Sequence, residues 1–215
     1  MLVKDRMTPN PVTVTPDTFF VEAMRIMGER GFRHLPVVDR KEKPVGIITQ
    51  TDLLNASPSP ATALSVSEVN YLLANLRIRD VMSSPVVTVS DDAPLEEAAR
   101  VMVENKFGCL PVIGAGKLVG VITETDIFKS FVEVLGGADA TLRVTVRLPD
   151  VRGELARLAG VIAQLGANIC SVAAFRGEDP DHAYLIFRVE GVAEEVLVPT
   201  LETAGEQIVH ICCAS

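Results

Sequence analysis

The pattern of hydrophobic and polar positions over residues 1–56 predicts a small unit of alternating strands and helices. A short β segment at residues 12–14 precedes an amphipathic helix, whose apolar residues recur at three- and four-residue spacing: Phe20, Ala23, Met24 and Met27. Gly31 suits the end of that helix. Apolar runs at residues 35–38 and 45–49 then predict two strands, and a second helix follows them. The predicted order is β-α-β-β-α.

The same pattern returns about 75 residues further along the chain. The Leu-Pro-Val segment at residues 35–37 recurs at residues 110–112, and the Gly-x-x-Thr-x-x-Asp segment at residues 46–52 recurs at residues 120–126. Many further matches occur in the same order, which chance does not explain. The chain therefore contains a tandem repeat, whose second copy we place at residues 78–135.

Residues 57–77 connect the two copies and begin with a Pro- and Ser-rich stretch. Ser65 and Glu68 have the spacing of a capping box, and Leu64 and Val69 are placed for a hydrophobic staple. A helix is therefore expected here, and it should pack against the repeats through four apolar positions: Val69, Leu72, Leu73 and Leu76. We expect a structural role for this helix.

The remaining residues, 140–215, form a separate predicted domain, and Gly136 and Gly137 mark a helix end and a hinge before it. Six elements follow in the order β-α-β-β-α-β: residues 142–148, 155–165, 168–175, 183–189, 193–203 and 207–212. The apolar stripe of the first helix consists of Leu155, Leu158, Ala159, Ile162 and Leu165. This order is the ferredoxin-like arrangement, so the predicted fold class of the whole chain is mixed α+β.

Two known families resemble these patterns. The order of elements, the Leu-Pro-Val strand and the repeated Gly-x-x-Thr-x-x-Asp segment resemble the CBS domain, which works in tandem pairs called Bateman modules. The Asp-x-x-Gly-x-Leu segment at residues 150–155 and the Gly-x-Asn-Ile segment at residues 166–169 resemble an ACT domain. A CBS pair followed by an ACT domain is similar to the acetoin-utilisation B-type proteins of bacteria. That resemblance suggests a link to acetoin metabolism, although no reaction follows from these residues.

The CBS resemblance implies that an adenosine-containing effector binds between the repeats: AMP, ADP, ATP, NAD or S-adenosylmethionine. Eight residues match the binding positions of the family: Gly46, Thr49, Thr51, Asp52, Gly120, Thr123, Thr125 and Asp126. The aspartates would accept the ribose hydroxyls, Thr49 and Thr123 would present a hydroxyl and a backbone N–H to phosphate, and the glycines would let a ligand or a backbone approach closely. From the residues alone, a second explanation is as good as ribose binding: the two aspartates could be carboxylates that stabilise a helix N-terminus.

The two copies differ just before the Leu-Pro-Val strand. The first copy has Arg33 and His34 there, whereas the second has Gly-Cys at residues 108–109. Because each cleft of a CBS pair is built from both repeats, the resemblance implies that Arg33 and His34 face Thr123 and Asp126. We expect that cleft to bind a phosphorylated ligand more tightly than the other. The alternative is that Arg33 is a surface cation and His34 a packed imidazole.

Four residues of the C-terminal domain match the positions where ACT domains hold an amino acid: Asp150, Gly153, Asn168 and Ile169. The alternative is that Gly153 only starts a helix and Asn168 only turns the chain, because many ACT domains are dimerisation surfaces without a ligand. The edge of such a sheet also needs to be covered. Side-by-side pairing of two sheets would cover it, so we expect a homodimer.

Composition narrows the range of partners. The formal net charge of -8 argues against a nucleic-acid-binding protein, while a few local cations could still hold a small anion. No apolar run approaches the roughly 20 residues of a membrane helix, and no secretion signal follows Met1. The four cysteines lack the spacing of metal ligands. We therefore expect a cytoplasmic protein without a nucleic-acid, membrane or metal partner.

The sequence shows no catalytic constellation. The three histidines, His34, His182 and His210, lie in separate segments, and no Gly-x-x-x-x-Gly-Lys loop is present for nucleotide hydrolysis. We predict a regulatory sensor without a catalytic cofactor, in which ligand binding to the CBS clefts acts through an ACT dimer on an unidentified protein. Two alternatives stay open: a scaffold whose clefts hold no ligand, and an enzyme with an unrecognised site.

Overall fold

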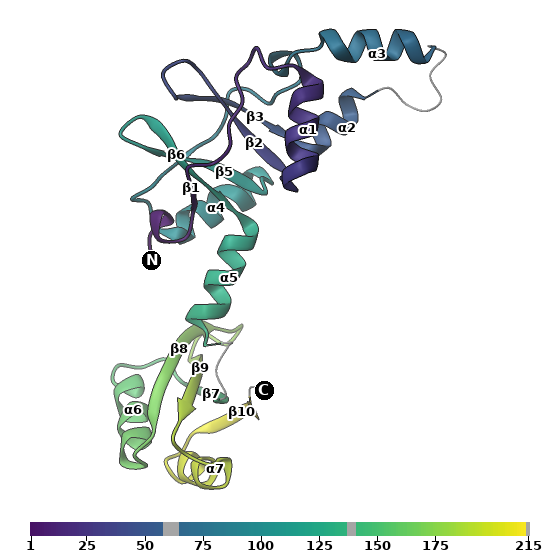
Figure 1. Ribbon diagram of the computed structural model, residues 1–215. Coiled ribbons are helices and arrows are strands. Elements are labelled where there is room, and N and C mark those ends of the chain that lie inside the picture. Colours follow the sequence, from purple (N-terminus) through teal and green to yellow (C-terminus); the bar gives the residue numbers. More distant parts are fainter. Residues whose placement is uncertain (58–64, 137–140, 214–215) are drawn as a thin grey trace. The chain divides into compact units, whose positions relative to one another are not determined.

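The computed structural model describes residues 1–57, 65–136 and 141–213. The chain divides into two compact units, Met1–Ile127 and Phe128–Ser215 (Figure 1). The predicted staple residue Leu64 and the second residue of the predicted hinge, Gly137, lie outside the described residues.

The first unit contains both repeats. Its first half consists of η1 (Val3–Asp5), β1 (Thr8–Pro9), α1 (Phe20–Arg30), β2 (His34–Val38), β3 (Pro44–Thr49), α2 (Gln50–Ala56) and α3 (Val66–Asn75). Its second half consists of η2 (Ile78–Asp80), β4 (Val89–Ser90), α4 (Leu95–Asn105), β5 (Cys109–Gly114), β6 (Lys117–Thr123) and α5 (Glu124–Val134), which runs on into the second unit. The predicted order β-α-β-β-α is confirmed in the second copy.

The amphipathic helix of the first repeat is confirmed, with one correction. Three predicted positions of its apolar stripe are buried: Phe20, Ala23 and Met27. The fourth, Met24, is 43% exposed, because the helix contacts its sheet along a stripe too narrow to include it. Gly31 ends the helix with a left-handed φ of 67°, and Lys106 takes the same conformation after α4 with a φ of 58°.

The short strand predicted at residues 12–14 does not form, so this prediction is wrong. Only Val14 forms a bridge there, parallel to Val37 of β2. Pro11 and Pro16 flank the segment, and proline has no N–H to extend a ladder. The corresponding segment of the second copy is the strand β4, which pairs parallel with β5.

The two repeats exchange their first segments. Val3 of η1 is fully buried in the core of the second repeat, and β1 pairs antiparallel with β6 of that repeat. In the same way, Ile78 of η2 is fully buried in the core of the first repeat. Each repeat therefore completes the core of the other, which holds the pair together as one unit.

The helix between the repeats begins with the predicted capping box, since the Ser65 hydroxyl accepts a hydrogen bond from the Glu68 backbone and the Glu68 carboxylate accepts one from the Ser65 backbone. Leu73 and Leu76 pack against the core of the first repeat, as predicted. Leu72 is 54% exposed, so its predicted contact with the repeats is wrong. It lies one residue before Leu73 and therefore points away from the face that Leu73 buries.

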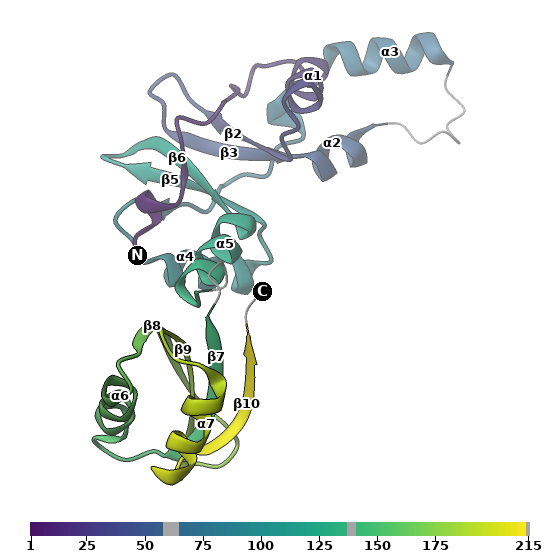
Figure 2. The same cartoon turned by 60° about the horizontal axis from the view of Figure 1, so that its bottom comes forward.

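The second unit has the predicted ferredoxin-like order. Its elements are β7 (Leu142–Pro149), α6 (Glu154–Gln164), β8 (Asn168–Arg176), β9 (His182–Glu190), α7 (Glu194–Thr203) and β10 (Gln207–Cys213). All strand pairs are antiparallel, in the order β10-β7-β9-β8, so that β10 runs beside β7 at one edge (Figure 2).

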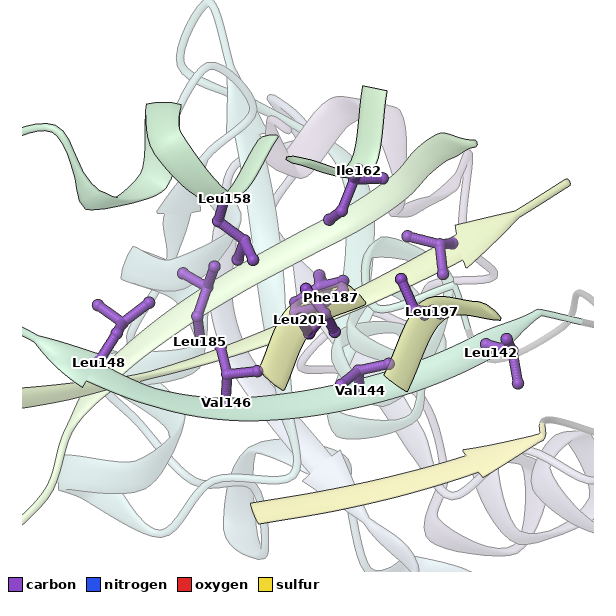
Figure 3. Packing of buried hydrophobic residues seen from close by; sticks show 11 residues of the cluster. Leu142, Val144, Val146, Leu148, Leu158, Ile162, Leu185, Phe187, Leu197 and Leu201 are labelled. Carbon is purple, nitrogen blue, oxygen red and sulfur yellow. The ribbon is translucent and has the colours of Figure 1, made fainter. Parts of the chain in front are cut away.

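The core of the second unit lies between one face of this sheet and the helices α6 and α7 (Figure 3). Alternate residues of β7 and β9 point into it, and Phe187 at its centre is 1% exposed. Leu158 and Ile162 of the predicted α6 stripe are buried, and Leu165 packs against their cluster. Leu155 is 51% exposed and is wrong as a member of that stripe, because it lies in the first turn, beyond the edge of the core.

Candidate functional site

A cleft of 210 Å³ in the first unit combines residues of both repeats. The first repeat lines it with Phe32, Arg33 and His34, and the second lines it with Val121 and Thr123. We call it the Arg33 cleft. It brings together three of the predicted site residues, and they come from the two repeats as the sequence predicts.

A second cleft, of 160 Å³, occupies the equivalent position in the other repeat. Its lining includes Lys106 and Phe107 of the second copy and Ile47 and Thr49 of the first. We call it the Lys106 cleft. The two clefts are related by the repeat, since Phe107 corresponds to Phe32 and Thr49 to Thr123.

Lys106 lines this cleft, although the sequence patterns do not single it out. It stands at the position of Gly31, and the left-handed conformation that it shares with Gly31 places it in the cleft lining. Each cleft therefore holds one cation, Arg33 in one and Lys106 in the other. The sequence does contain a signal for Lys106, because a lysine stands there at a helix end where the first copy has glycine.

His34 and Cys109 line both clefts, since they occupy the same place in the two repeats. Burial lowers the pKa of His34 below its usual value, and the neighbouring Arg33 guanidinium lowers it further, against the smaller opposing effects of Glu124 and Asp52. The imidazole is therefore neutral at pH 7 and offers one donor and one acceptor. Burial, with a smaller contribution from Asp126, raises the pKa of the Cys109 thiol to about 12, so this thiol stays protonated.

The predicted aspartates hold the starts of α2 and α5. Oδ2 of Asp52 accepts hydrogen bonds from the backbone N–H and from the hydroxyl of Thr49, both at 2.8 Å. Oδ2 of Asp126 accepts the same two bonds from Thr123, at 2.9 and 2.7 Å. Neither aspartate lines a cleft. Both donors of each threonine are thus directed at its aspartate, and each threonine hydroxyl also accepts a hydrogen bond from the backbone N–H of that aspartate. One acceptor lone pair of the hydroxyl is left for a ligand.

The predicted glycines allow close contact between protein segments. A Cβ on Gly46 would lie 2.6 Å from Sδ of Met82 and 3.1 Å from the Ser83 carbonyl oxygen. A Cβ on Gly120 would collide with Sδ of Met7. Of the two roles predicted for these glycines, the structure contains the close approach of a backbone, made by the exchanged segments of the repeats.

The other two predicted residues of the first unit, Thr51 and Thr125, lie in the first turns of α2 and α5. Both are exposed, and neither is in the lining of a cleft.

At the predicted amino-acid site of the second unit, the polar side chains form hydrogen bonds within the protein. Oδ2 of Asp150 accepts a hydrogen bond from Nε of Arg176 at 2.7 Å, and the Asn168 amide donates to Glu190 at 2.9 Å. Gly153 precedes α6 with a φ of 96°, and Ile169 packs against the core. The structure brings Asp150 and Gly153 together in the β7–α6 loop, whereas Asn168 and Ile169 begin β8.

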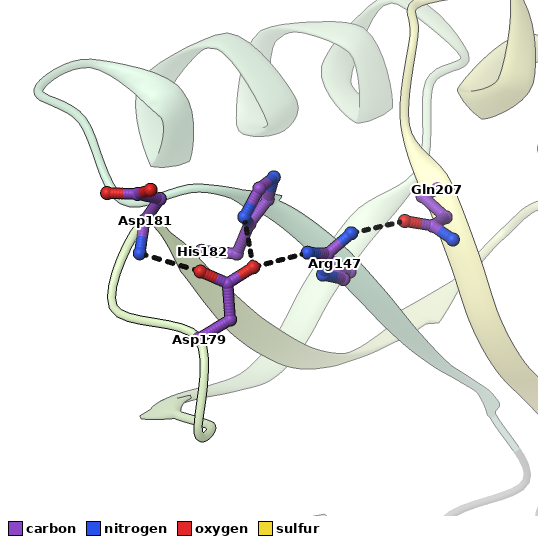
Figure 4. Close-up of polar contacts among 5 residues, drawn as sticks. All are labelled: Arg147, Asp179, Asp181, His182 and Gln207. Atoms are coloured by element: carbon purple, nitrogen blue, oxygen red, sulfur yellow. Dashed lines mark hydrogen bonds and ion pairs between the residues drawn. The ribbon is translucent and has the colours of Figure 1, made fainter.

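A polar network next to this loop fixes the turn between β8 and β9 (Figure 4). Oδ2 of Asp179 lies 2.6 Å from Nη2 of Arg147 and 2.8 Å from Nδ1 of His182. Arg147 also donates to Gln207 of β10 at 3.2 Å. Hydrogen bonds, first from the backbone N–H of Asp181 and then from Arg147, lower the pKa of Asp179. The network therefore ties the turn to the strands β7 and β10.

Two classes of site are absent from the described residues, 1–57, 65–136 and 141–213. No group of three or more His, Cys, Asp or Glu side chains in these ranges is arranged to hold a metal ion. Within the same ranges, no helix is both long enough and apolar enough to cross a bilayer.

Comparison with known families gives two matches. A model of the CBS domain matches residues 3–59 and 78–133, and a model of the TTHA0829-like ACT domain matches residues 140–212. Among curated proteins, the uncharacterized protein MJ1225 of Methanocaldococcus jannaschii is 33% identical over 132 residues, which cover 60% of this chain and 47% of the relative. The chain thus spans about half the length of that relative.

Three solved structures are similar to the CBS pair. A putative acetoin utilization protein (AcuB) from Vibrio cholerae is 33% identical, with a TM-score of 0.53 over 63% of this chain and 93% of that chain. CBSX2 from Arabidopsis thaliana, in complex with AMP, is 30% identical, with a TM-score of 0.52 over 62% of this chain and 97% of that chain. The CBS domain pair of protein MJ0100, in complex with 5-methylthioadenosine and S-adenosyl-L-methionine, is 28% identical, with a TM-score of 0.51 over 65% of this chain and 98% of that chain.

Proposed function

The chain belongs to the CBS-domain family, with two CBS domains followed by an ACT domain, and we propose that it is a regulatory sensor of adenosine-containing ligands. The observation that carries the proposal is the Arg33 cleft, in which Arg33 and His34 of one repeat meet Thr123 of the other. Two of the similar structures hold AMP or S-adenosylmethionine. A ligand that spans both repeats would favour one arrangement of the pair by its differential affinity.

The two clefts differ in the cation that each offers, and this difference predicts a preference. The planar guanidinium of Arg33 can hold a phosphate through two parallel hydrogen bonds, whereas the ammonium of Lys106 acts as a point charge. A phosphorylated ligand such as AMP, ADP or ATP should therefore prefer the Arg33 cleft. The acceptor side of the Thr123 hydroxyl and the neutral His34 imidazole suit the ribose and the base.

The two predicted aspartates support the clefts from outside their linings. Asp126 and Asp52 orient Thr123 and Thr49 through the hydrogen bonds at the helix starts. Removing an aspartate should weaken the ligand held next to its threonine. We therefore expect Asp126→Ala to weaken nucleotide binding more than Asp52→Ala. Equal losses, or a larger loss for Asp52→Ala, would contradict the preference for the Arg33 cleft.

A thermal-shift screen tests the sensor function itself. At 100 times its dissociation constant, a ligand should stabilise the protein by about 2.7 kcal/mol. The screen uses AMP, ADP, ATP, NAD and S-adenosylmethionine on the full chain. If none of the five moves the melting curve, the clefts are those of a scaffold and the sensor proposal fails. Long incubation with ATP or NAD tests for an enzyme, and consumption of either would favour that alternative.

For the ACT domain we propose dimerisation as the main role. Its strands β8 and β10 form the two edges of the sheet, and an edge without a partner strand invites pairing with another chain. Light scattering of the full chain should give the mass of a homodimer, and a monomeric mass at micromolar concentration would refute this. Amino-acid binding near Asp150, Gly153, Asn168 and Ile169 is a second role, which calorimetric titration with the common amino acids would test.

The sensor would act on a regulated protein in the cytoplasm. The first candidate for the process that it regulates is acetoin metabolism. The similarity to the Vibrio cholerae protein supports this candidate. Loss of growth on acetoin after deletion of the gene, restored by the wild-type chain, would support it further, whereas normal growth of the deletion strain would argue against it.

A further inference from the structure

The second unit has one sheet face that α6 and α7 leave open. Both α6 and α7 pack on the face that carries the core residues Val144, Val146 and Phe187. The alternate residues of β7 and β9 point to the opposite side, which we call the open face: Arg143, Thr145, Arg147, Tyr184, Ile186 and Arg188. Gly136, which follows α5, lies next to Arg188 at this face.

Two arginines lie directly opposite each other on the open face. Arg143 of β7 and Arg188 of β9 are partners in the antiparallel register. Within the described residues neither forms an ion pair, and each guanidinium donates only to a neutral hydroxyl at 3.3 Å, Arg143 to Thr145 and Arg188 to Thr141. Arg147, four residues further along β7, has Asp179 at 2.6 Å.

This pair is unfavourable for the isolated sheet. Like charges directly opposite each other on neighbouring strands are destabilising, and the side chains at such positions start about 5 Å apart. Arg147 on the same strand differs, because the carboxylate of Asp179 lies beside its guanidinium. The pair is therefore suited to a negatively charged group that comes from outside the domain.

The surroundings hold both side chains in place. Both arginines are half-buried, and Thr145, which accepts a hydrogen bond from Arg143, is 7% exposed. Gly136 lies close to the aliphatic part of the Arg188 side chain. A Cβ added to Gly136 would lie 2.8 Å from Cδ of Arg188 and 3.3 Å from Oγ of Ser171. With its φ of 67°, Gly136 also has a conformation that other residues rarely adopt. A guanidinium whose stem is fixed loses less entropy when it binds.

We propose that Arg143 and Arg188 form a binding site for a divalent oxyanion, namely a phosphate monoester, on the open face of the ACT domain. Two guanidiniums supply two positive charges and paired N–H donors, and a phosphate monoester carries about -1.5 to -2 at pH 7. The charges therefore match. A second copy of the same face is a poor occupant, because it would place arginines against arginines.

The site is separate from the CBS clefts and does not depend on their ligand. The phosphate can belong to a free metabolite or to a phosphorylated side chain of a partner protein, since both present the same group. A phosphorylated partner would connect the ACT domain to a regulated protein, and a free metabolite would make it a second sensor. Comparing a phosphopeptide with inorganic phosphate separates these sources.

Titration of the full chain with inorganic phosphate tests the site, with the arginine Nε–Hε resonances observed by NMR. The background carries Arg33→Gln, which removes the cation of the Arg33 cleft, and sodium chloride keeps the ionic strength constant. We expect saturable shifts at both Arg143 and Arg188. Arg143→Gln should weaken the response of Arg188 by about tenfold or more, because the two guanidiniums share one anion. Arg152→Gln, an exposed arginine in the β7–α6 loop, is the matched control and should change nothing.

A phosphoserine peptide and its unphosphorylated form provide the second arm. Tighter binding of the phosphopeptide than of inorganic phosphate would identify a protein partner as the source, and equal or weaker binding would identify a free metabolite. The proposal is overturned if the shifts do not saturate, or if Arg143→Gln leaves the Arg188 response unchanged. It is also overturned if succinate binds as tightly as phosphate, since the site would then not select phosphate.

Discussion

Replacing Gly120 by alanine tests whether the motif glycines serve the exchanged segments or the ligand. The new Cβ would lie 3.1 Å from the Thr8 carbonyl oxygen and would collide with Sδ of Met7. Overpacking of this kind costs typically about 1–3 kcal/mol, and alanine recovers about 0.5–1 kcal/mol of backbone entropy relative to glycine. The expected net loss for Gly120→Ala is therefore about 1–2 kcal/mol in the unfolding free energy of the first unit.

The matched control is Gly28→Ala in α1. No atom lies within 4 Å of the Cβ that this substitution would add, so it should stabilise the unit by about 0.5–1 kcal/mol. Shortening the colliding side chain provides a rescue, since Met7→Ala combined with Gly120→Ala should cost less than the sum of the single substitutions by at least about 0.5 kcal/mol.

Urea denaturation followed by hydrogen-exchange mass spectrometry is the suitable assay, because peptides from the two units report their stabilities separately. The reasoning is refuted if Gly120→Ala is as stable as Gly28→Ala and instead binds AMP more weakly. In that case the glycine would make room for the ligand and not for Met7.

Three further predictions concern single groups. Burial raises the pKa of Glu206, which is 5% exposed beside Arg157, so the native state holds its proton more strongly than the unfolded chain does. The protonated Glu206 therefore stabilises the native state fully below its ordinary pKa of 4.5, and this stabilisation is lost as the pH rises through the raised pKa. Glu206→Gln should abolish this dependence of the unfolding free energy on pH in urea titrations. Cys109, with its pKa raised to about 12, should resist iodoacetamide at pH 8 while the exposed Cys213 reacts, and equal labelling in the native protein would contradict this. Thr123→Val removes the cap of α5 and should cost about 1 kcal/mol of unfolding free energy, whereas Thr125→Val in the exposed first turn should cost much less.

Local patterns made much of the fold predictable from the sequence. The repeated motif, the capping box at Ser65 and the left-handed helix end at Gly31 each depend on residues a few positions apart, and the structure contains all three. The six elements of the second unit could be found for the same reason, because strand and helix periodicities differ. The predicted burial of Met24 and Leu72 is wrong, because a periodic stripe gives the direction of a helix face but not the width of the surface that it buries.

Long-range features could not be predicted in this way. The burial of Val3 in the second repeat and of Ile78 in the first depends on contacts between distant segments, in which Val3 donates to the Ala93 carbonyl and Ile78 to the Thr18 carbonyl. For the candidate site, the meeting of Arg33 with Thr123 was expected from the family, whereas Lys106 enters its cleft only through its backbone conformation. The pairing of Arg143 with Arg188 depends on the register of two strands, which the sequence does not specify.

The most direct test of the central claim, that an adenosine ligand binds between the repeats, is calorimetric titration of AMP into the wild type and two variants. Arg33→Gln removes the cation of the cleft, and Arg30→Gln removes an exposed arginine at the end of α1, outside both cleft linings. We predict saturable binding to the wild type, a loss of about tenfold or more for Arg33→Gln, and no change for Arg30→Gln. Absence of AMP binding to the wild type, or equal affinities for all three proteins, would contradict the account.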